Sequence, residues 1–131
     1  MAESERSAKP FLRPRRSWAR RFADAMRGIV VGVQGQPSCY VHLAAGLAVV
    51  ALAAALKVSY LEWCVLVVCI VMVLGAELLN GAIEQLARAV DECENARLRD
   101  SLDIASGAVL TVAAGAAITG GIIFLRHLWM M

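Results

Sequence analysis

The residues best suited to chemistry lie in one short stretch, Glu77-Leu-Leu-Asn-Gly-Ala-Ile-Glu84. Glu77, Asn80 and Glu84 are spaced i, i+3 and i+7, so a helix of about 3.6 residues per turn presents all three on one face. The run before them, Cys64 to Ala76, carries no charge. Because a carboxylate in the apolar part of a bilayer costs roughly 3 kcal/mol, such residues usually pair or line a polar site. We therefore expect this face to build a site at a membrane boundary.

Two chemical roles suit the two carboxylates of this stretch. Glu77, the deeper one, can act as general base on a lipid hydroxyl, because a buried carboxylate is a competent proton acceptor. Glu84 can hold a divalent cation that bridges phosphate oxygens, since Mg²⁺ takes one or two carboxylates together with phosphate and water. The alternative is that both only pair with arginines such as Arg27 or Arg88. The chain lacks the G-x-x-x-x-G-K-[ST] loop and the HRD and DFG triplets of soluble phosphotransferases.

Composition indicates a small integral membrane protein. The chain has 131 residues, room for one domain, and 60% of them are hydrophobic. The mean hydropathy is +0.64, and a soluble domain of this size buries such an apolar excess only with difficulty. Four cysteines show no CxxC pair and no histidine at zinc spacing, so we expect unpaired packing thiols: Cys39, Cys64, Cys69 and Cys93. The polar, basic amino terminus does not have the pattern of a cleavable signal peptide.

The amino-terminal third divides into an arm and a helix. Residues 1–16 combine Ser, Pro and five basic residues, which predicts a disordered arm lying against anionic headgroups. Nucleic-acid binding is the alternative for such a run, but the membrane-bound neighbour favours lipid, and we expect no nucleic-acid partner. From about 17 to 35 apolar residues recur every three or four positions, which predicts an amphipathic helix in the membrane interface. Gly35 and Pro37 are expected to end it.

The rest of the domain, which extends over 17–131, carries three apolar spans at about 40–59, 61–86 and 104–125. Each approaches the ~20 residues needed to cross a bilayer. The predicted fold is therefore all-α: three transmembrane helices plus an amino-terminal amphipathic surface helix. The charged stretch 88–103 is expected to form an aqueous helical extension and turn. The third span is rich in glycine, which predicts close helix packing.

The distribution of basic residues predicts the topology. Eleven of the 13 lie in the amino-terminal segment and in 88–103, whereas only Lys57 and Arg126 lie on the opposite side. The positive-inside rule then places the amino terminus and the 88–103 connection in the cytoplasm, and the carboxyl terminus outside. If this topology holds, four polar residues lie together near the cytoplasmic face, where ATP is present: Gln36, Asn80, Glu84 and Asp103.

The octapeptide closely resembles the motif E-[IL]-[LM]-N-[ST]-A-I-E of the prokaryotic diacylglycerol kinase family, which includes undecaprenol kinases. Shorter matches accompany it without a gap over about 85 to 100 residues: Arg27-Gly28, Val41-His42-Leu43, Glu62-Trp63 and Asp103-Ile-Ala-Ser-Gly-Ala-Val-Leu110. The resemblance implies a homotrimer in the bacterial inner membrane that transfers the γ-phosphate of Mg·ATP to a lipid hydroxyl, on diacylglycerol or undecaprenol. It also implies shared sites between protomers.

The resemblance implies a role for each matching residue. Glu77 would be the catalytic base and Asn80 would support it. Glu84 would ligate Mg²⁺, and Asp103 would lie at the nucleotide. Gln36 stands where the family usually has a glutamate that is the second metal ligand, and would bind the metal more weakly.

Other positions also depart from the family pattern. Leu102 replaces a lysine expected near the phosphates, Arg88 replaces an aspartate, and Tyr40 replaces an arginine. Compensation of charge at phosphate by Arg97, Arg99 or Arg88 is a hypothesis, as is help with the metal from Asp91, Glu92 or Glu94.

Three functions compete on these observations. The first is a lipid kinase that uses ATP and Mg²⁺. The second is a catalytically weakened or inactive relative that binds nucleotide or lipid, which Gln36 and Leu102 favour. The third, a proton-coupled transporter, explains Glu77 but not the position of Glu84 and Asp103. His42 is expected to be a headgroup or interhelix hydrogen-bond partner rather than a metal ligand.

Overall fold

The computed structural model describes residues 17–90 and 95–130. They form four helices: α1 (Trp18–Gln34), α2 (Pro37–Ala55), α3 (Tyr60–Val90) and α4 (Ala96–Trp129). By length and composition, α2, α3 and α4 are each able to span a membrane. The predicted all-helical fold with three spans and a shorter amino-terminal helix is therefore confirmed. The predicted arm 1–16, together with Asp91, Glu92, Cys93 and Glu94, lies outside the described residues.

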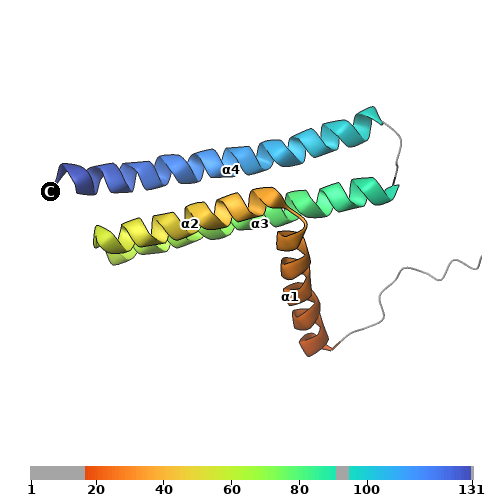
Figure 1. Cartoon of the computed structure of the whole chain (residues 1–131), viewed down its shortest axis with the longest axis horizontal. Helices are drawn as coiled ribbons and strands as arrows, with labels where there is room; N and C mark the ends of the chain where they lie inside the picture. Colours follow the sequence, from red (N-terminus) through yellow and green to blue (C-terminus); the bar gives the residue numbers. More distant parts are fainter. Residues whose placement is uncertain (1–16, 91–94, 131) are drawn as a thin grey trace, which may run out of the picture.

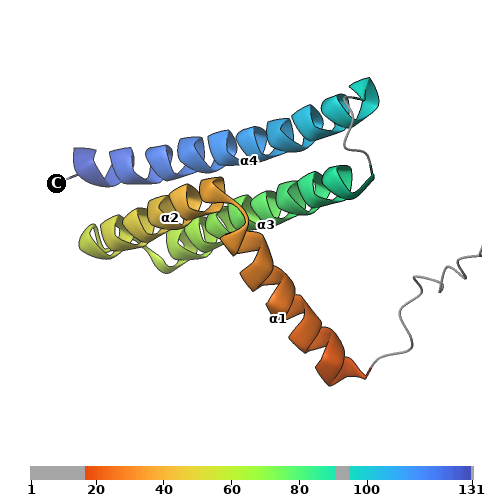
Figure 2. The same ribbon diagram turned by 45° about the vertical axis from the view of Figure 1, so that its right-hand side comes forward.

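The three long helices lie side by side, and α1 projects away from them (Figures 1 and 2). α3 packs against both α2 and α4, and α1 contacts α2 and α3. The carboxyl terminus lies at the same end of the bundle as the turn between α2 and α3 (Figure 1). The junction of α1 with α2 therefore lies beside the second half of α3, which carries the octapeptide.

Only one of the two residues expected to end α1 does so. Gly35 is the C-cap: its N–H donates to the carbonyl of Val31 at 3.1 Å, and the N–H of Gln36 donates to the carbonyl of Val33 at 3.4 Å. Pro37 instead begins α2, three residues before the first span was predicted to start. A proline suits this first turn because its fixed φ is already helical and its missing N–H would have no partner there.

The turn between α2 and α3, residues 56–59, is longer than the single residue that the predicted spans leave between them. α2 ends at Ala55, and Lys57 adopts a left-handed conformation with φ 51°. Ser59 and Glu62 then form a capping box: the Ser59 N–H donates to Glu62 Oε2 at 2.8 Å, and the Glu62 N–H donates to Ser59 Oγ at 3.4 Å. These bonds satisfy free amides at the helix start, which is why α3 begins at Tyr60.

α3 and α4 extend beyond the apolar spans predicted for them. α3 continues to Val90 and α4 begins at Ala96, so most of the charged stretch is continuous with the spanning helices. The side chain of Asn95 accepts from the N–H of Arg97 at 3.0 Å and caps α4. An asparagine at this position stabilises a helix start, typically by about 1 kcal/mol.

The glycines that mark close contact with a neighbouring helix lie in α1 and α2: a Cβ at Gly32 would lie 2.5 Å from Leu78 Cδ2 of α3. A Cβ at Gly46 would lie 3.3 Å from Ile70 Cγ2, so α2 and α3 touch tightly there. A Cβ at Gly107, Gly115 or Gly121 would meet nothing within 4 Å. α4 packs extensively against α3, and the α4 glycine at which an added Cβ would meet that helix is Gly120, 3.9 Å from Leu66 Cδ2. A small buried core lies at the end of the bundle that carries the α2–α3 turn, and consists of Ala53, Val58, Leu66 and Ile123.

Candidate active site

Two helices bring a set of polar side chains together at the start of α2. Gln36 is the N-cap residue of α2, and Ser38 and His42 follow one turn apart on the same face. Across from them, α3 presents the three residues whose spacing predicted a common face. We call these six residues the polar cluster: Gln36, Ser38, His42, Glu77, Asn80 and Glu84.

Glu77 is the most deeply buried member of the polar cluster, at 3% exposure. Ser38 Oγ donates to Glu77 Oε2 at 2.8 Å. His42 Nε2 lies 3.0 Å from Glu77 Oε1, and the His42 side chain is 25% exposed. Because a carboxylate only accepts, the imidazole must carry a proton on Nε2. His42 is thus an interhelix partner, as its sequence position indicates, and among the described residues no arginine pairs with Glu77.

Glu84 is held mainly by two amides. Its Oε1 accepts from Asn80 Nδ2 at 2.9 Å, and its Oε2 accepts from Gln36 Nε2 at 2.8 Å. Arg88 lies further away, at 3.9 Å from Oε2, and its side chain is 81% exposed. An exposed pair of this kind contributes at most about 1 kcal/mol. The alternative in which arginines hold both carboxylates therefore applies only weakly, and only to Glu84.

Gln36 and Ser38 join the two carboxylates into one network. Ser38 Oγ lies 3.3 Å from Gln36 Oε1, and its single proton is directed to the nearer Glu77. Gln36 itself is buried and lies over Gly81, where an added Cβ would be only 3.0 Å from Gln36 Nε2. The family motif has serine or threonine at this position. The amide at 36 and the glycine at 81 therefore fit each other sterically.

Asn80 has one polar atom without a partner among the described residues. Its Oδ1 is fully buried and accepts no hydrogen bond, while Nδ2 donates to Glu84. The orientation of the amide is determined by this bond, because a reversed amide would direct an oxygen at a carboxylate. A buried acceptor without a donor is uncommon and costs free energy. A hydroxyl or a metal-bound water would satisfy it.

The structure brings together four of the five residues that the sequence singled out. Gln36, Glu77, Asn80 and Glu84 belong to one network, whereas Asp103 is exposed on α4. Within residues 17–90 and 95–130, no hydrogen bond or ion pair joins Asp103 to the polar cluster. Sequence reasoning missed Ser38. The available signal was a hydroxyl four residues before His42, at the start of an apolar span.

The donor set fits Mg²⁺ through one carboxylate. No group of three His, Cys, Asp or Glu side chains that could hold a metal occurs among the described residues. Glu84, whose side chain is 31% exposed, is the accessible carboxylate, and Asn80 Oδ1 is an unpartnered oxygen beside it. Mg²⁺ at phosphate sites commonly uses one or two carboxylates and completes its shell with phosphate and water. When bound, the ion would neutralise phosphate charge.

These features define a multi-pass membrane protein with a buried, hydrogen-bonded carboxylate site at one end of its helical bundle. The sequence model of the prokaryotic diacylglycerol kinase family matches residues 23–124, which include the whole polar cluster and Asp103. The chain therefore belongs to this family, whose members are lipid kinases. Neither the curated proteins nor the solved structures contain a match to the chain.

Proposed function

We propose that the protein phosphorylates the hydroxyl of a membrane lipid, diacylglycerol or undecaprenol, at the expense of ATP and in the presence of Mg²⁺. The observation that carries the proposal is the arrangement of the two carboxylates. Glu77 is buried and held by a hydroxyl and an imidazole, whereas Glu84 is partly exposed and held by amides. One environment suits a proton acceptor inside the bundle, and the other suits an ion and phosphate at its edge.

Each residue of the site has a distinct role in this proposal. Glu77 is the general base that takes the hydroxyl proton, and Asn80 positions Glu84 through its amide. Glu84 holds Mg²⁺, with Gln36 as a weak neutral neighbour. Asp103 lies at the nucleotide. These roles leave positioning and charge stabilisation as the main contributions of the protein, as is usual in phosphoryl transfer.

The same proposal includes a topology and an assembly. The amino terminus and the α3–α4 connection lie in the cytoplasm, supported by the 11 basic residues on that side. The protomer assembles as a homotrimer, which family membership supports. Labelling of single cysteines from either side of sealed vesicles tests the topology, and the mass of the purified protein in detergent tests the trimer.

The direct test is phosphate transfer from labelled ATP to a lipid extract in detergent micelles with Mg²⁺. Wild type is expected to produce lipid-linked label that Glu77→Gln abolishes. The mobility of the product separates phosphatidate from undecaprenyl phosphate and so identifies the acceptor. No lipid-linked label from well-folded wild type, even at high Mg²⁺, would rule out the kinase.

One contact favours the competing function, a nucleotide- or lipid-binding relative without catalysis. Gln36 Nε2 donates to Glu84 Oε2 at 2.8 Å, so an amide occupies the oxygen that a metal would need. Leu102 also favours the competing function, because it stands where the family has a lysine that is expected near the phosphates. The two functions differ in one experiment: Gln36→Glu combined with Leu102→Lys creates activity in an idle protein, but only increases it in a weak kinase.

A further inference from the structure

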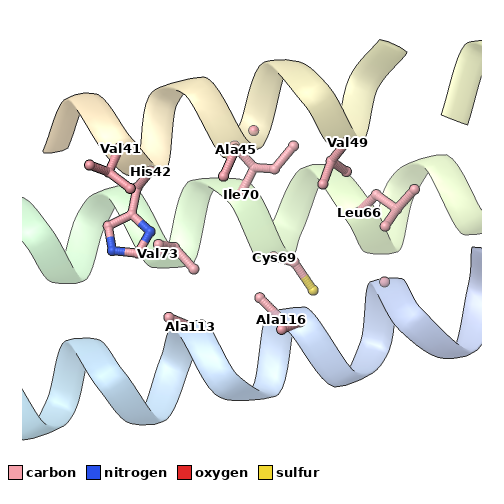
Figure 3. Close-up of a pocket in the computed structure, with 13 residues that line it drawn as sticks. Val41, His42, Ala45, Val49, Leu66, Cys69, Ile70, Val73, Ala113 and Ala116 are labelled. Atoms are coloured by element: carbon pink, nitrogen blue, oxygen red, sulfur yellow. The ribbon is translucent and has the colours of Figure 1, made fainter. Parts of the chain in front are cut away.

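Two hollow regions lie between the membrane-spanning helices in the part of the chain that the structure describes, and their linings differ. The larger, a cavity of about 360 Å³ between α2, α3 and α4, is apolar apart from the imidazole of His42, which extends toward Ala113 and Ala116 (Figure 3). The smaller, which we call the groove, has a volume of about 270 Å³ and lies between the start of α3 and the end of α4. Of the two, only the groove has an arginine in its lining, Arg126.

The groove is apolar along its length and charged at one end. Its walls are aliphatic side chains of α3 and α4: Leu61, Val65, Ile122 and Ile123. Thr119 lies seven residues before Arg126, or about 10 Å along a helix that rises 1.5 Å per residue. The Thr119 hydroxyl donates to the Gly115 carbonyl at 2.9 Å, within its own helix. Because the groove has nearly twice the volume of a cavity that holds benzene, about 150 Å³, a segment of one hydrocarbon chain fits it.

The charged end of the groove lies at the depth of lipid headgroups. Tyr60 and Trp129, each close in sequence to a residue of the lining, are 85% and 88% exposed. Exposed aromatic side chains at the ends of spanning helices are typical of the interface between membrane and water. This is the end of the bundle with the carboxyl terminus and the α2–α3 turn (Figure 1), so the groove is separate from the polar cluster.

The two charged residues of the groove differ in how far their partners satisfy them. Glu62 is 13% exposed, and besides Arg126 it contacts the Ser59 N–H and hydroxyl and the His127 ring. Arg126 is 66% exposed, and its guanidinium contacts Glu62 Oε1 at the long distance of 3.5 Å. A guanidinium has five N–H donors in a planar fork that matches the oxygens of a phosphate. Arg126 can therefore keep its contact with Glu62 and still bind an anion.

We propose that the groove binds an anionic phospholipid, with its phosphate on the guanidinium of Arg126 and part of one acyl chain between α3 and α4. A zwitterionic phospholipid has the same phosphate, but its own ammonium group offsets the phosphate charge and competes with the guanidinium. The bound lipid contacts both helices, and so adds to the Glu62 contact that joins them. The proposal does not depend on lipid kinase activity, because the groove and the polar cluster lie at opposite ends of the bundle.

The first experiment maps the lipid by photolabelling of the full chain in phosphatidylcholine vesicles. A trace of phosphatidylglycerol with a diazirine in its acyl chain is compared with phosphatidylcholine that carries the same chain, and labelled peptides are identified by mass spectrometry. We expect the anionic probe to label the groove about fivefold more, the contribution of one basic residue at a membrane surface. Arg126→Gln should remove this preference. Lys57→Gln, which removes the same charge from the turn at the same end, should keep it.

A second pair of variants separates lipid binding from the contact between the helices. Both Arg126→Gln and Glu62→Gln break the contact between these two side chains, but only Arg126→Gln removes the guanidinium. We therefore expect Glu62→Gln to keep or increase labelling of the groove by the anionic probe. Equal loss in folded Glu62→Gln and Arg126→Gln would overturn the proposal, since Arg126 would then act only through Glu62. Circular dichroism shows whether each variant is folded, and labelling of α1 at the other end provides the internal reference.

The third test concerns the acyl chain. Ile122 and Ile118 are both 64% exposed on α4, but only Ile122 lines the groove. Ile122→Trp should abolish labelling of the groove by obstructing it, and the matched control Ile118→Trp should keep it. Equal labelling by the two probes in wild type, or unchanged labelling in Ile122→Trp, would overturn the proposal. If a helix of a second copy fills the groove instead, neither probe labels it, Ile122→Trp alone changes the oligomeric state, and the proposal falls.

Discussion

Two glutamates of α3 each lie 3.0 Å from a histidine nitrogen and accept from a serine hydroxyl, but the surroundings of the two pairs differ. Glu62 contacts His127 of α4, and Glu77 contacts His42 of α2. The glutamates are fifteen residues apart, or about 22 Å along a helix that rises 1.5 Å per residue. One pair therefore lies at the end of the bundle with the α2–α3 turn, and the other lies in the polar cluster.

The Glu62 pair has the features of a structural contact. Its carboxylate accepts from the N–H and the hydroxyl of Ser59, each at 2.8 Å, and Arg126 approaches its other oxygen at 3.5 Å. Arg126 and His127 thus hold the start of α3 to the end of α4, while the capping box satisfies the amides at the start of α3 itself. Additional charge-assisted bonds of this kind make a carboxylate a poor proton acceptor.

The Glu77 pair is arranged differently. Its donors are a hydroxyl and an imidazole from one helix, and no permanent cation contacts it among the described residues. The cavity adjoins its histidine, and an unpartnered amide oxygen lies one turn away on α3. The same carboxylate–imidazole contact therefore has two uses. It is structural at Glu62, where an arginine and backbone and hydroxyl donors also hold the carboxylate, and it is available for chemistry at Glu77, where no permanent cation among the described residues prevents the carboxylate from accepting a proton.

The largest predicted effect separates the two glutamates. Glu77→Gln should reduce lipid phosphorylation by about 10³-fold or more, because it removes the general base. Glu62→Gln should keep phosphorylation within about threefold of wild type and should lower the melting temperature, because it weakens a contact between helix ends. Turnover of labelled ATP and thermal unfolding in one detergent measure both quantities.

Equal loss of activity in folded Glu62→Gln would break the comparison, since the two pairs would then be functionally alike. Normal melting of Glu62→Gln would show that the contact between α3 and α4 contributes little. The conservative change is chosen because an amide keeps the volume and some of the hydrogen bonds of each carboxylate.

The second prediction changes the metal edge of the polar cluster. Gln36→Glu replaces the donor that lies 2.8 Å from Glu84 Oε2 by a carboxylate. Two carboxylates at this distance repel, so the melting temperature should fall in EDTA. Mg²⁺ should reverse the loss, and the Mg²⁺ concentration for half-maximal activity should fall about tenfold, because a second carboxylate joins the ion.

An unchanged Mg²⁺ requirement in Gln36→Glu would show that Glu84 does not bind the metal. The control is Arg88→Gln, which alters charge near Glu84 at an exposed position. It should change melting very little, since exposed ion pairs contribute at most about 1 kcal/mol.

Much of this arrangement could be predicted from sequence because it follows helical periodicity. The spacing of Glu77, Asn80 and Glu84 predicts their common face, and the long apolar runs predict the spans. Charge content alone also located the connection near 88–103. What periodicity cannot predict is which face of α2 meets that site, because that depends on how Gly46 lets α2 pack against α3.

Ser38 cannot be identified from sequence because its role depends on which face of α2 meets α3. Pro37 is predicted to end α1 but begins α2, because proline suits both the residue after a helix and the first turn of the next. The bond between Gln36 and Glu84 was equally inaccessible, because it links residues 48 positions apart through an N-cap conformation. The family motif indicated that an amide at 36 weakens metal binding. It did not indicate that the amide lies against Gly81 and donates to the carboxylate itself.

The third prediction uses two glycines of α3. Gly81→Ala places a Cβ 3.0 Å from Gln36 Nε2, whereas a Cβ at Gly75 meets nothing within 4 Å. Gly81→Ala should therefore displace Gln36 and reduce lipid phosphorylation about five- to tenfold, a loss of about 1–1.4 kcal/mol. Gly75→Ala should keep activity and raise stability by about 0.5–1 kcal/mol, because alanine is the better helix former.

The opposite result from Gly81→Ala would be equally informative. If phosphorylation rises instead, then Gln36 inhibits the site by occupying Glu84, and its displacement frees that oxygen for the metal. An unchanged activity would show that the contact between Gln36 and Gly81 does not position Glu84 at all.

The smallest predicted effect concerns Ser38, the member of the polar cluster that sequence reasoning missed. Ser38→Ala removes the donor at 2.8 Å from Glu77 Oε2 and leaves the His42 contact in place. A net hydrogen bond contributes about 0.5–1.5 kcal/mol, so phosphorylation should fall about two- to tenfold, mostly in kcat. Ser38→Thr keeps the hydroxyl and should retain most of the activity. If Ser38→Ala instead equals Glu77→Gln in its loss, then Ser38 is itself required for proton transfer, and the contrast between the two glutamate–histidine pairs no longer explains the chemistry.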